Sequence, residues 1–523
     1  MGYIARLYEW CRREWPSILV IAFSAAIQLV LVTRPFPFSI QNLLPDDAFF
    51  YFTVARNLVN GLGSTFDGIN ATNGYHPLWL VIVALITKIT GSNMVGDTTP
   101  IQAALFLSIA MNVAAAAIVS RILSRFTKSR WITAFGLVIW VLNPFFIYEI
   151  LNGLETSLAL LLFSIFVLLA IRIEEGRPII GGYFLVGLVG SLMILARLDM
   201  VFYVIAFILW VLLHFGWREG WKRAAAVCVG CLPFLGWIIW NVSQFHMLLT
   251  SAANIEMLLE HQLIVQDHGT STAQFLKAIV YSTQYIMNLF FHKTGMFALG
   301  CGLIGAAVAL YAQGAIVLPR RLRDLSVVLA LFGGFAALFI ADAMIRWTYR
   351  TWYFVSFELF LAILAVVVVG VIFPQLRYKR SMTVLLLALT LFSFYVNWSK
   401  ALQPSKSDMK TQIELLQTAQ WMNEHLSPGT LVGTFSPGIQ GFFSEVPVID
   451  LDGWINDSAA AAMQERQLWK YIKDQNIEYL WDYGPALSYR YKSFLGIDDP
   501  FERMALIEDL TNDPHGFRLY KIK

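Results

Sequence analysis

Residues 44–56 read Leu44-Pro45-Asp46-Asp47-Ala48-Phe49-Phe50-Tyr51-Phe52-Thr53-Val54-Ala55-Arg56, two adjacent acids followed closely by four consecutive aromatic side chains. One aspartate is enough to cap a helix, so capping explains Asp46 alone. A second acid in a segment whose aromatic residues press against a membrane needs another reason. Adjacent carboxylates near a low-dielectric surface raise one pKa, which suits a general base. Helix capping and catalysis are the two interpretations of the pair.

Outward from this stretch, the composition is that of a membrane protein. Of 523 residues, 57% are hydrophobic and only 14% are charged, whereas a soluble domain carries about 25% charged residues. Residues 399–523 hold 29 of the 73 charged residues in less than a quarter of the chain. We therefore expect a transmembrane domain over 1–398 and a soluble domain over 399–523.

Charge and cysteine usage exclude other classes. The net charge is only +3, and the soluble part is acidic and would repel phosphate backbones, which excludes nucleic-acid binding as the function. The four cysteines lie in or beside apolar segments, so we expect neither disulfides nor a zinc site. The histidines show no metal-ligand spacing, so no metal is expected.

A bilayer-spanning helix needs about 20 apolar residues, and the chain offers eleven clear candidates. They are 17–33, 101–124, 131–149, 154–173, 179–196, 200–215, 223–244, 295–318, 325–345, 352–373 and 381–398. Two weaker runs, 77–89 and 275–291, are short or broken by polar residues.

Loop charge orients these helices, because cytoplasmic loops collect Lys and Arg. The body of the chain has six basic clusters: Arg6/Arg12/Arg13, Arg121/Arg125/Lys128/Arg130, Arg172/Arg177, Arg218/Lys222/Arg223, Arg320/Arg321/Arg323 and Arg377/Lys379/Arg380. All six face the cytoplasm only if the two weak runs lie at the outer surface. This predicts about eleven spans, an N-terminus in the cytoplasm, and a first outer loop over 34–100 with juxtamembrane helices. If both weak runs span the membrane, the count is thirteen and a basic cluster faces outward.

The soluble part alternates helices and strands, which predicts a small extracytoplasmic α/β domain. We expect helices over 407–426, 458–474 and 500–511, and strands over 430–435, 446–450, 477–482 and 517–522. The stretch Ser436-Pro437-Gly438-Ile439-Gln440-Gly441 could cradle an anion, but it lacks the phosphate-loop pattern, so a turn is the favoured interpretation.

Few other charges face outward, which makes each of them informative. Glu155 lies in a tight outer turn, where a helix dipole would stabilise it. Arg197 and Asp199 lie between two short membrane helices, where charges are costly unless they face a cavity or each other. Arg346 and Arg350 are spaced i, i+4 and break the positive-inside pattern; they either snorkel to lipid headgroups or grip a phosphate.

Three motifs resemble the GT-C superfamily of membrane glycosyltransferases, which includes the lipid A aminoarabinose transferases and the protein O-mannosyltransferases. They are the Asp46–Tyr51 stretch, Thr72-Asn73-Gly74-Tyr75-His76-Pro77-Leu78-Trp79 and Asn152-Gly153-Leu154-Glu155-Thr156. The resemblance covers residues 17–215 and rests on topology and the arginine pair beyond them. It implies the GT-C fold.

The resemblance also implies an activity: inverting transfer of a sugar from a polyprenyl-phosphate donor to an acceptor at the outer face of the cytoplasmic membrane. Asp46 matches the family's general base, and Asp47 would orient or share that role. Arg346 and Arg350 would compensate the charge of the leaving phosphate. The other expected substrate-binding residues are Glu155, Arg197, Asp199, Tyr75 and His76. Neither a metal nor another cofactor is expected, and the acceptor, a glycan, lipid or protein, stays open.

Two alternatives come from other classes. A transporter or flippase of a lipid-linked or small polar substrate would require inverted repeats and mid-membrane helix breaks, and the sequence shows no internal duplication. A scaffold whose outer domain binds a partner would leave the acidic pair and the arginine pair unexplained.

Overall fold

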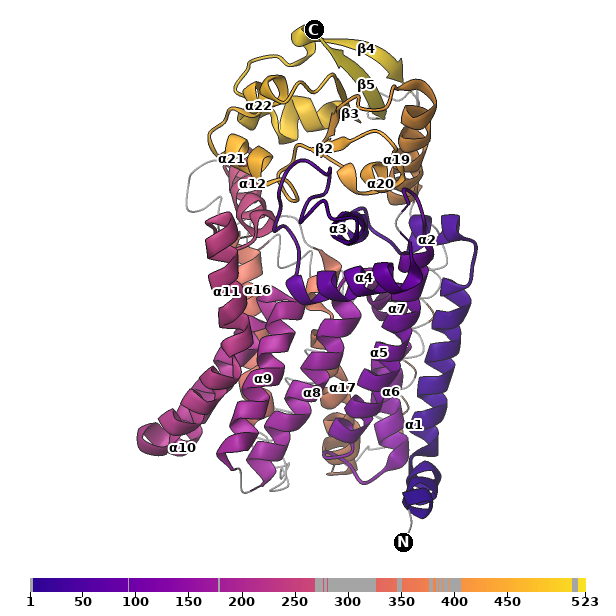
Figure 1. Ribbon diagram of the computed structural model, residues 1–523. Coiled ribbons are helices and arrows are strands. Elements are labelled where there is room, and N and C mark those ends of the chain that lie inside the picture. Colours follow the sequence, from indigo (N-terminus) through magenta and orange to yellow (C-terminus); the bar gives the residue numbers. More distant parts are fainter. Residues whose placement is uncertain are drawn as a thin grey trace.

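The computed structural model describes residues 3–92, 94–176, 179–268, 326–345, 350–375, 406–509 and 516–523, with a few single positions between 276 and 395. Helices form an upright bundle at one end of the molecule, and a small sheet with its own helices lies at the other (Figure 1). The N-terminus lies at the far end of the bundle, and the C-terminus lies in the outer domain.

The bundle consists of apolar helices, because a bilayer leaves no partner for backbone groups except those within the helix. Five described segments are long and apolar enough to cross a membrane: Glu14–Val32, Thr99–Leu123, Thr156–Glu175, Leu198–Gly230 and Phe357–Gln375. The helices are α1 (Tyr3–Val32), α5 (Thr99–Leu123), α6 (Arg130–Val141), α7 (Pro144–Ile150), α8 (Thr156–Glu175), α9 (Ile180–Ala196), α10 (Val201–Gly230), α11 (Leu232–Phe245), α12 (Ser251–His268), α16 (Ser326–Ile345) and α17 (Phe357–Val367). The chain is thus a multi-pass membrane protein.

Several predicted spans differ in detail. The run 131–149 is two helices, α6 and α7, because Pro144 cannot continue the ladder of α6 and begins α7 instead. Helix α10 is interrupted at Gly216, whose backbone angles of φ 69° and ψ 165° are open to glycine. The run 295–318 and most of the runs 275–291 and 381–398 fall outside the described residues. The number of spans therefore stays a prediction.

The first outer loop contains three helices, α2 (Phe36–Asn42), α3 (Ala48–Val59) and α4 (Pro77–Thr90). Helix α4 lies across the top of the bundle instead of along it (Figure 1), as expected for a run at the outer surface. The aromatic side chains of α3 do not face a membrane, contrary to our expectation. Phe49 and Phe52 are fully buried, and α3 lies between the bundle and the outer domain.

The outer domain is built on a five-stranded sheet in the order β2-β1-β3-β5-β4. Strand β1 (Val432–Thr434) pairs in parallel with β2 (Val448–Asp450) and β3 (Tyr479–Tyr483). Strand β5 (Phe517–Ile522) is antiparallel to both β3 and β4 (Met504–Asp509). The four predicted strands all occur: β5 has the predicted bounds, and each end of the other three lies within two residues of the predicted position.

Helices cover both faces of this sheet. On one face, Val448 and Trp481 pack with α19 (Lys406–His425) and α20 (Pro437–Phe443). On the other face, Ile449 and Leu480 pack with α21 (Asp457–Gln464), α22 (Leu468–Asp474) and α23 (Lys492–Leu495). After β1 the chain therefore passes to one face of the sheet, and after the adjacent strand β2 it passes to the other face. Open α/β sheets bind ligands outside the carboxyl ends of such a strand pair.

Two helix predictions in this domain were wrong. Residues 500–511 form a short 3-10 turn, Phe501–Arg503, and then strand β4. The helix-favouring residues of β4 are overridden because its backbone pairs with β5 along the sheet edge. The single helix 458–474 is divided into α21 and α22, which are separated by Arg466 in a left-handed conformation with φ 55°.

Candidate functional site

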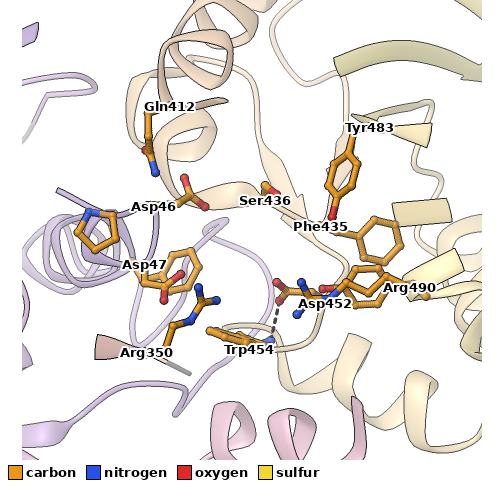
Figure 2. A pocket seen from close by; sticks show the side chains of 13 residues that line it. Asp46, Asp47, Arg350, Gln412, Phe435, Ser436, Asp452, Trp454, Tyr483 and Arg490 are labelled. Atoms are coloured by element: carbon orange, nitrogen blue, oxygen red, sulfur yellow. Dashed lines mark hydrogen bonds between the residues drawn. The ribbon is translucent and has the colours of Figure 1, made fainter. Parts of the chain in front are cut away.

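A cavity of about 180 Å³ lies where the first outer loop meets the outer domain (Figure 2). It has a membrane side and an outer-domain side. Its lining consists of Pro45, Asp46, Asp47, Phe50, Arg350, Gln412, Phe435, Ser436, Asp452, Trp454, Tyr483, Arg490 and Tyr491. The acidic pair and Arg350, three of the residues predicted from sequence, are therefore brought together at one cavity.

The outer-domain side of the cavity is formed at the carboxyl ends of the three parallel strands. Ser436 follows β1, Asp452 follows β2, and Tyr483 ends β3. The cavity thus opens at the diverging ends of β1 and β2, where the topology predicts a ligand site. Sequence reasoning missed Asp452 and Tyr483, and it named Ser436 only as part of the stretch 436–441. The available signal was polar side chains directly after predicted strands.

Asp46 is bound by the outer domain. Its carboxylate accepts the backbone N–H of Gly438 at 3.0 Å and that of Ile439 at 2.7 Å, one on each oxygen. The capping interpretation is wrong, because the residue at the N-cap of α3 is Asp47, whose side chain makes no capping bond. Burial raises the pKa of Asp46 to about 7, the two backbone bonds oppose this rise, and Asp47 adds to it.

The stretch Ser436–Gly441 therefore does hold an anionic group, although it was expected to be a turn. It forms the start of α20, and the anion is a carboxylate of the same chain. The N–H groups at the start of a helix have no partner within the helix, so they are available to an acceptor from another segment.

Asp47 and Arg350 face each other on the membrane side of the cavity (Figure 2). Burial raises the pKa of Asp47, the positive charge of Arg350 opposes the rise, and Glu155 adds to it. Arg350 has extended backbone angles of φ −96° and ψ 119°. The helix face that it was predicted to share with its i−4 neighbour is therefore not formed at Arg350, and Arg346 lies outside the described residues.

Arg350 also lies among aromatic rings. Its guanidinium carbon is 5.6 Å from the ring centre of Trp454 and 5.7 Å from that of Trp352. Its buried Nε has no hydrogen-bond partner among the described residues. Arginine packed on rings and short of acceptors suits an anionic group, because the guanidinium can bind phosphate with several N–H donors.

Glu155 is the centre of a second polar cluster behind the acidic pair. Its carboxylate accepts the Tyr51 hydroxyl at 3.0 Å and lies 3.6 Å from Nε2 of His76. The Tyr51 hydroxyl oxygen also accepts the backbone N–H of His76 at 3.2 Å. Burial raises the pKa of Glu155, and the charge of Arg197 opposes this. Glu155 and His76, both predicted as site residues, are thus joined through Tyr51, which sequence reasoning missed.

Arg197 and Asp199 form an ion pair of 3.0 Å, and Arg197 is fully buried. The Arg197 guanidinium lies 4.6 Å from the ring centre of Tyr353 and also donates to the Trp352 carbonyl. These contacts satisfy the expectation that charges at this depth face each other. They also link the pair to the segment that carries Arg350.

Tyr75 lies elsewhere. Its hydroxyl hydrogen-bonds to that of Ser64 at 2.6 Å inside the first outer loop, and Tyr75 is not part of the cavity lining.

The outer domain contributes further buried acids. Asp482 accepts three donors, Phe435 N–H, Thr434 Oγ1 and Tyr483 N–H, so it holds the ends of β1 and β3 together. Burial raises the pKa of Asp482 to about 6. Asp452 lines the cavity, and burial together with Asp450 raises its pKa well above the ordinary value. Among the described residues, no three acidic, histidine or cysteine side chains are grouped to hold a metal ion.

Comparison with known proteins gives the family context. Residues 404–519 match the profile of a domain of unknown function (DUF8728). A search of curated proteins finds no match. Among solved structures, ArnT from Cupriavidus metallidurans, bound to undecaprenyl phosphate, is 12% identical with a TM-score of 0.58, covering 96% of this chain and 97% of that chain.

A second similar structure is the Archaeoglobus fulgidus oligosaccharyltransferase tethered with an acceptor peptide. It is 12% identical with a TM-score of 0.55, covering 93% of this chain and 71% of that chain. Both neighbours are GT-C glycosyltransferases. The match extends over the bundle and the outer domain alike, whereas the sequence motifs covered only the first half of the chain. The chain is therefore a multi-pass membrane protein with the GT-C fold.

Proposed function

We propose that this protein transfers a sugar, with inversion, from a polyprenyl-phosphate donor to an acceptor at the outer face of the cytoplasmic membrane. The observation that carries the proposal is the facing pair of Asp47 and Arg350 in a cavity between bundle and outer domain. Displacement of a phosphate by a hydroxyl requires a carboxylate that can take the hydroxyl proton and a cation that can compensate the charge of the departing phosphate. The fold supports it, because the ArnT structure with undecaprenyl phosphate shares it.

In the proposed reaction, an acceptor hydroxyl oxygen attacks the anomeric carbon of the donor sugar. The new glycosidic bond forms on the face opposite the bond that breaks, so the configuration inverts. The proton of the hydroxyl passes to Asp47. The electron pair of the broken bond stays on the phosphate oxygen, and the polyprenyl phosphate leaves with its extra negative charge next to Arg350.

We assign the base to Asp47 and not to Asp46, which the family resemblance favoured. Both carboxylate oxygens of Asp46 already accept backbone N–H groups. These bonds stabilise its ionised form and oppose proton uptake. Asp47 lines the same cavity, with its charge set between Arg350 and Glu155. Burial raises the pKa of both acids, so the assignment rests on the backbone bonds that occupy the Asp46 carboxylate and not on the pKa.

The cluster behind the pair has a supporting role in this proposal. Glu155, held by Tyr51 and close to His76, adds negative charge near Asp47. Arg197 and Asp199 fix the segment next to Arg350 through Trp352 and Tyr353. These residues would therefore set the charge balance and the spacing of the reacting groups.

The test is mass spectrometry of products formed by the purified full-length protein from a panel of polyprenyl-phosphate sugars and candidate glycan, lipid and peptide acceptors. We expect one combination to give a glycosylated acceptor and free polyprenyl phosphate. Asp47→Asn should abolish this product. Asp499→Asn is the control, because Asp499 is an exposed acid of the outer domain. Movement of the intact lipid-linked sugar across vesicles without any covalent product would instead support a transporter or flippase.

A further inference from the structure

Helix α20 of the outer domain is held at both ends by the first outer loop. At its start, the carboxylate of Asp46 accepts the N–H groups of Gly438 and Ile439. At its end, the guanidinium of Arg56 donates to the carbonyl of Phe442 at 3.1 Å and to that of Gly441 at 3.4 Å. These are the backbone groups that a helix leaves without internal partners. The acidic side chain of Asp46 thus accepts N–H groups that have no partner within the helix. The cationic side chain of Arg56 donates to carbonyl groups that have none within the helix.

The close approach of the two backbones depends on glycine. A Cβ atom on Gly438 would lie 2.1 Å from the carbonyl oxygen of Asp46, and one on Gly441 would lie 2.5 Å from the ring of Phe66. The two glycines are three residues apart, so they share one face of α20. That face rests directly on the first outer loop.

Aromatic packing completes the contact. Phe49 of α3 lies edge-on to Phe442, with ring centres 5.4 Å apart, and 5.9 Å from Phe443. Arg56 itself is buried, and burial lowers its pKa only to about 10, so it stays charged near neutral pH. The carbonyl of Phe442 also accepts the N–H of Gly96 at 3.0 Å. Both ends of α20 and the face between them are therefore in contact with residues 46–96.

We propose that Asp46 and Arg56 form a clamp on α20 that docks the outer domain and sets the spacing across the cavity, and that this is the role of Asp46. Ser436, one residue before α20, lines the cavity on the outer side, and Asp47 lines it on the membrane side. Asp46 is then a positioning residue, which acts through the outer domain. The part of this inference that concerns reaction geometry rests on the proposed function, whereas the docking contact does not.

Hydrogen exchange of the full-length protein tests the clamp without any substrate. In Asp46→Asn and in Arg56→Gln, exchange of residues 437–443 should rise about tenfold, as expected when a charge-assisted hydrogen bond is lost. Exchange of residues 468–474 in α22 should not change, because α22 belongs to the far face of the sheet. Asp47→Asn and Asp499→Asn should leave both segments as in the wild type.

A steric variant makes the test independent of charge. Gly438→Ala should raise exchange in 437–443 in the same way, while Gly181→Ala, where an added Cβ meets nothing within 4 Å, should not. A variant that also raised exchange in α22 would have unfolded the outer domain. In that case the other two of the three variants Asp46→Asn, Arg56→Gln and Gly438→Ala would test the clamp. Unchanged exchange of 437–443 in Asp46→Asn and Arg56→Gln would overturn the clamp.

Activity separates positioning from catalysis. Asp46→Asn and Arg56→Gln should raise the KM for the acceptor more than they lower kcat, and both should keep the wild-type pH profile. An Asp46→Asn variant with wild-type exchange, normal KM and no turnover would show that Asp46 is the base and overturn the positioning role. Absence of glycosyl transfer with every donor would count against the proposed function but would leave the exchange result standing.

Discussion

The carboxylate of Asp46 accepts the backbone N–H of Ile439 at 2.7 Å, although 393 positions separate the two residues in sequence. Two adjacent acids therefore have different environments. Both line the cavity, but the carboxylate of Asp46 also binds the backbone of α20, whereas the charge of Asp47 is set between Arg350 and Glu155.

The first prediction concerns the division of labour in the pair. Asp47→Asn should lower kcat by roughly 10²–10⁴-fold, the range for loss of a general base. Asp46→Asn should retain measurable kcat, because it removes only the charge and one of the two oxygens that accept backbone N–H groups of α20. Steady-state kinetics with saturating donor measures both. The assignment fails if the two variants lose equal amounts of kcat.

The second prediction concerns the acidic limb of the pH–rate profile. A base acts only when deprotonated, and burial raises the pKa of Asp47 above the ordinary aspartate value of 3.8. The value of kcat/KM should therefore rise with pH through a limb placed above 3.8. Asp46→Asn should shift this limb little. Disappearance of the limb in the Asp46→Asn variant would show that Asp46, and not Asp47, is the general base.

The third prediction concerns Arg350. Arg350→Gln removes the charge that faces Asp47, so the leaving phosphate loses its compensation and the donor KM should rise while kcat falls. The pKa of Asp47 should rise further, because the opposing positive charge is gone. The pH–rate limb of Arg350→Gln should therefore lie above that of the wild type. A limb at the same pH as in the wild type would show that the charge of Arg350 does not act on Asp47.

The fourth prediction is a linkage between pH and stability through Asp482. Its pKa in the folded protein, about 6, is above the ordinary value of 3.8, so the folded state binds the proton more tightly than the unfolded state. Its contribution to the free energy of unfolding should fall as pH rises from about 4 to about 6, by at most about 1.4 kcal/mol per pH unit. The Tm difference between wild type and Asp482→Asn should decrease across this window. A difference that grew with pH would contradict the direction.

The fifth prediction concerns the cluster around Glu155. Tyr51→Phe removes the hydroxyl that donates to this buried carboxylate, and an unsatisfied buried acceptor costs about 1–3 kcal/mol. The Tm of the purified protein should fall accordingly. Tyr395→Phe, at an exposed tyrosine, is the matched control and should leave the Tm unchanged.

Much of the architecture could be predicted from the sequence. Scarcity of charge in the first 398 residues indicates the membrane bundle, and alternation after 430 indicates the strands. The helix predicted over 500–511 failed because the pairing of β4 with β5 is a long-range interaction that residue propensity does not contain. The break between α6 and α7 was readable from Pro144.

The site was predictable in its members and not in its geometry. Asp46, Asp47, Glu155 and Arg350 stand out because the predicted topology leaves so few charges on the outer side. The adjacency of the two acids, however, gives no information about which of them binds the outer domain. That depends on α20: the sequence of residues 436–441 suggested a possible anion cradle, but nothing in it indicates that the anion is the carboxylate of Asp46. The same reasoning placed Tyr75 in the site only through the resemblance, and its hydroxyl is used inside the loop by Ser64.

The two sides of the cavity are built from different kinds of structure. Asp46 and Asp47 lie in the turn before α3, and Arg350 lies in an extended segment next to the bundle. On the other side, Ser436 and Asp452 lie in loops that follow strands, and Tyr483 is the last residue of a strand. Loops at such positions tolerate replacement without disturbing the sheet that supports them. Under the proposed function, exchanging these loops would redirect the sugar to a different recipient molecule while the transfer chemistry stayed unchanged, which makes the outer domain a natural target for engineering acceptor choice.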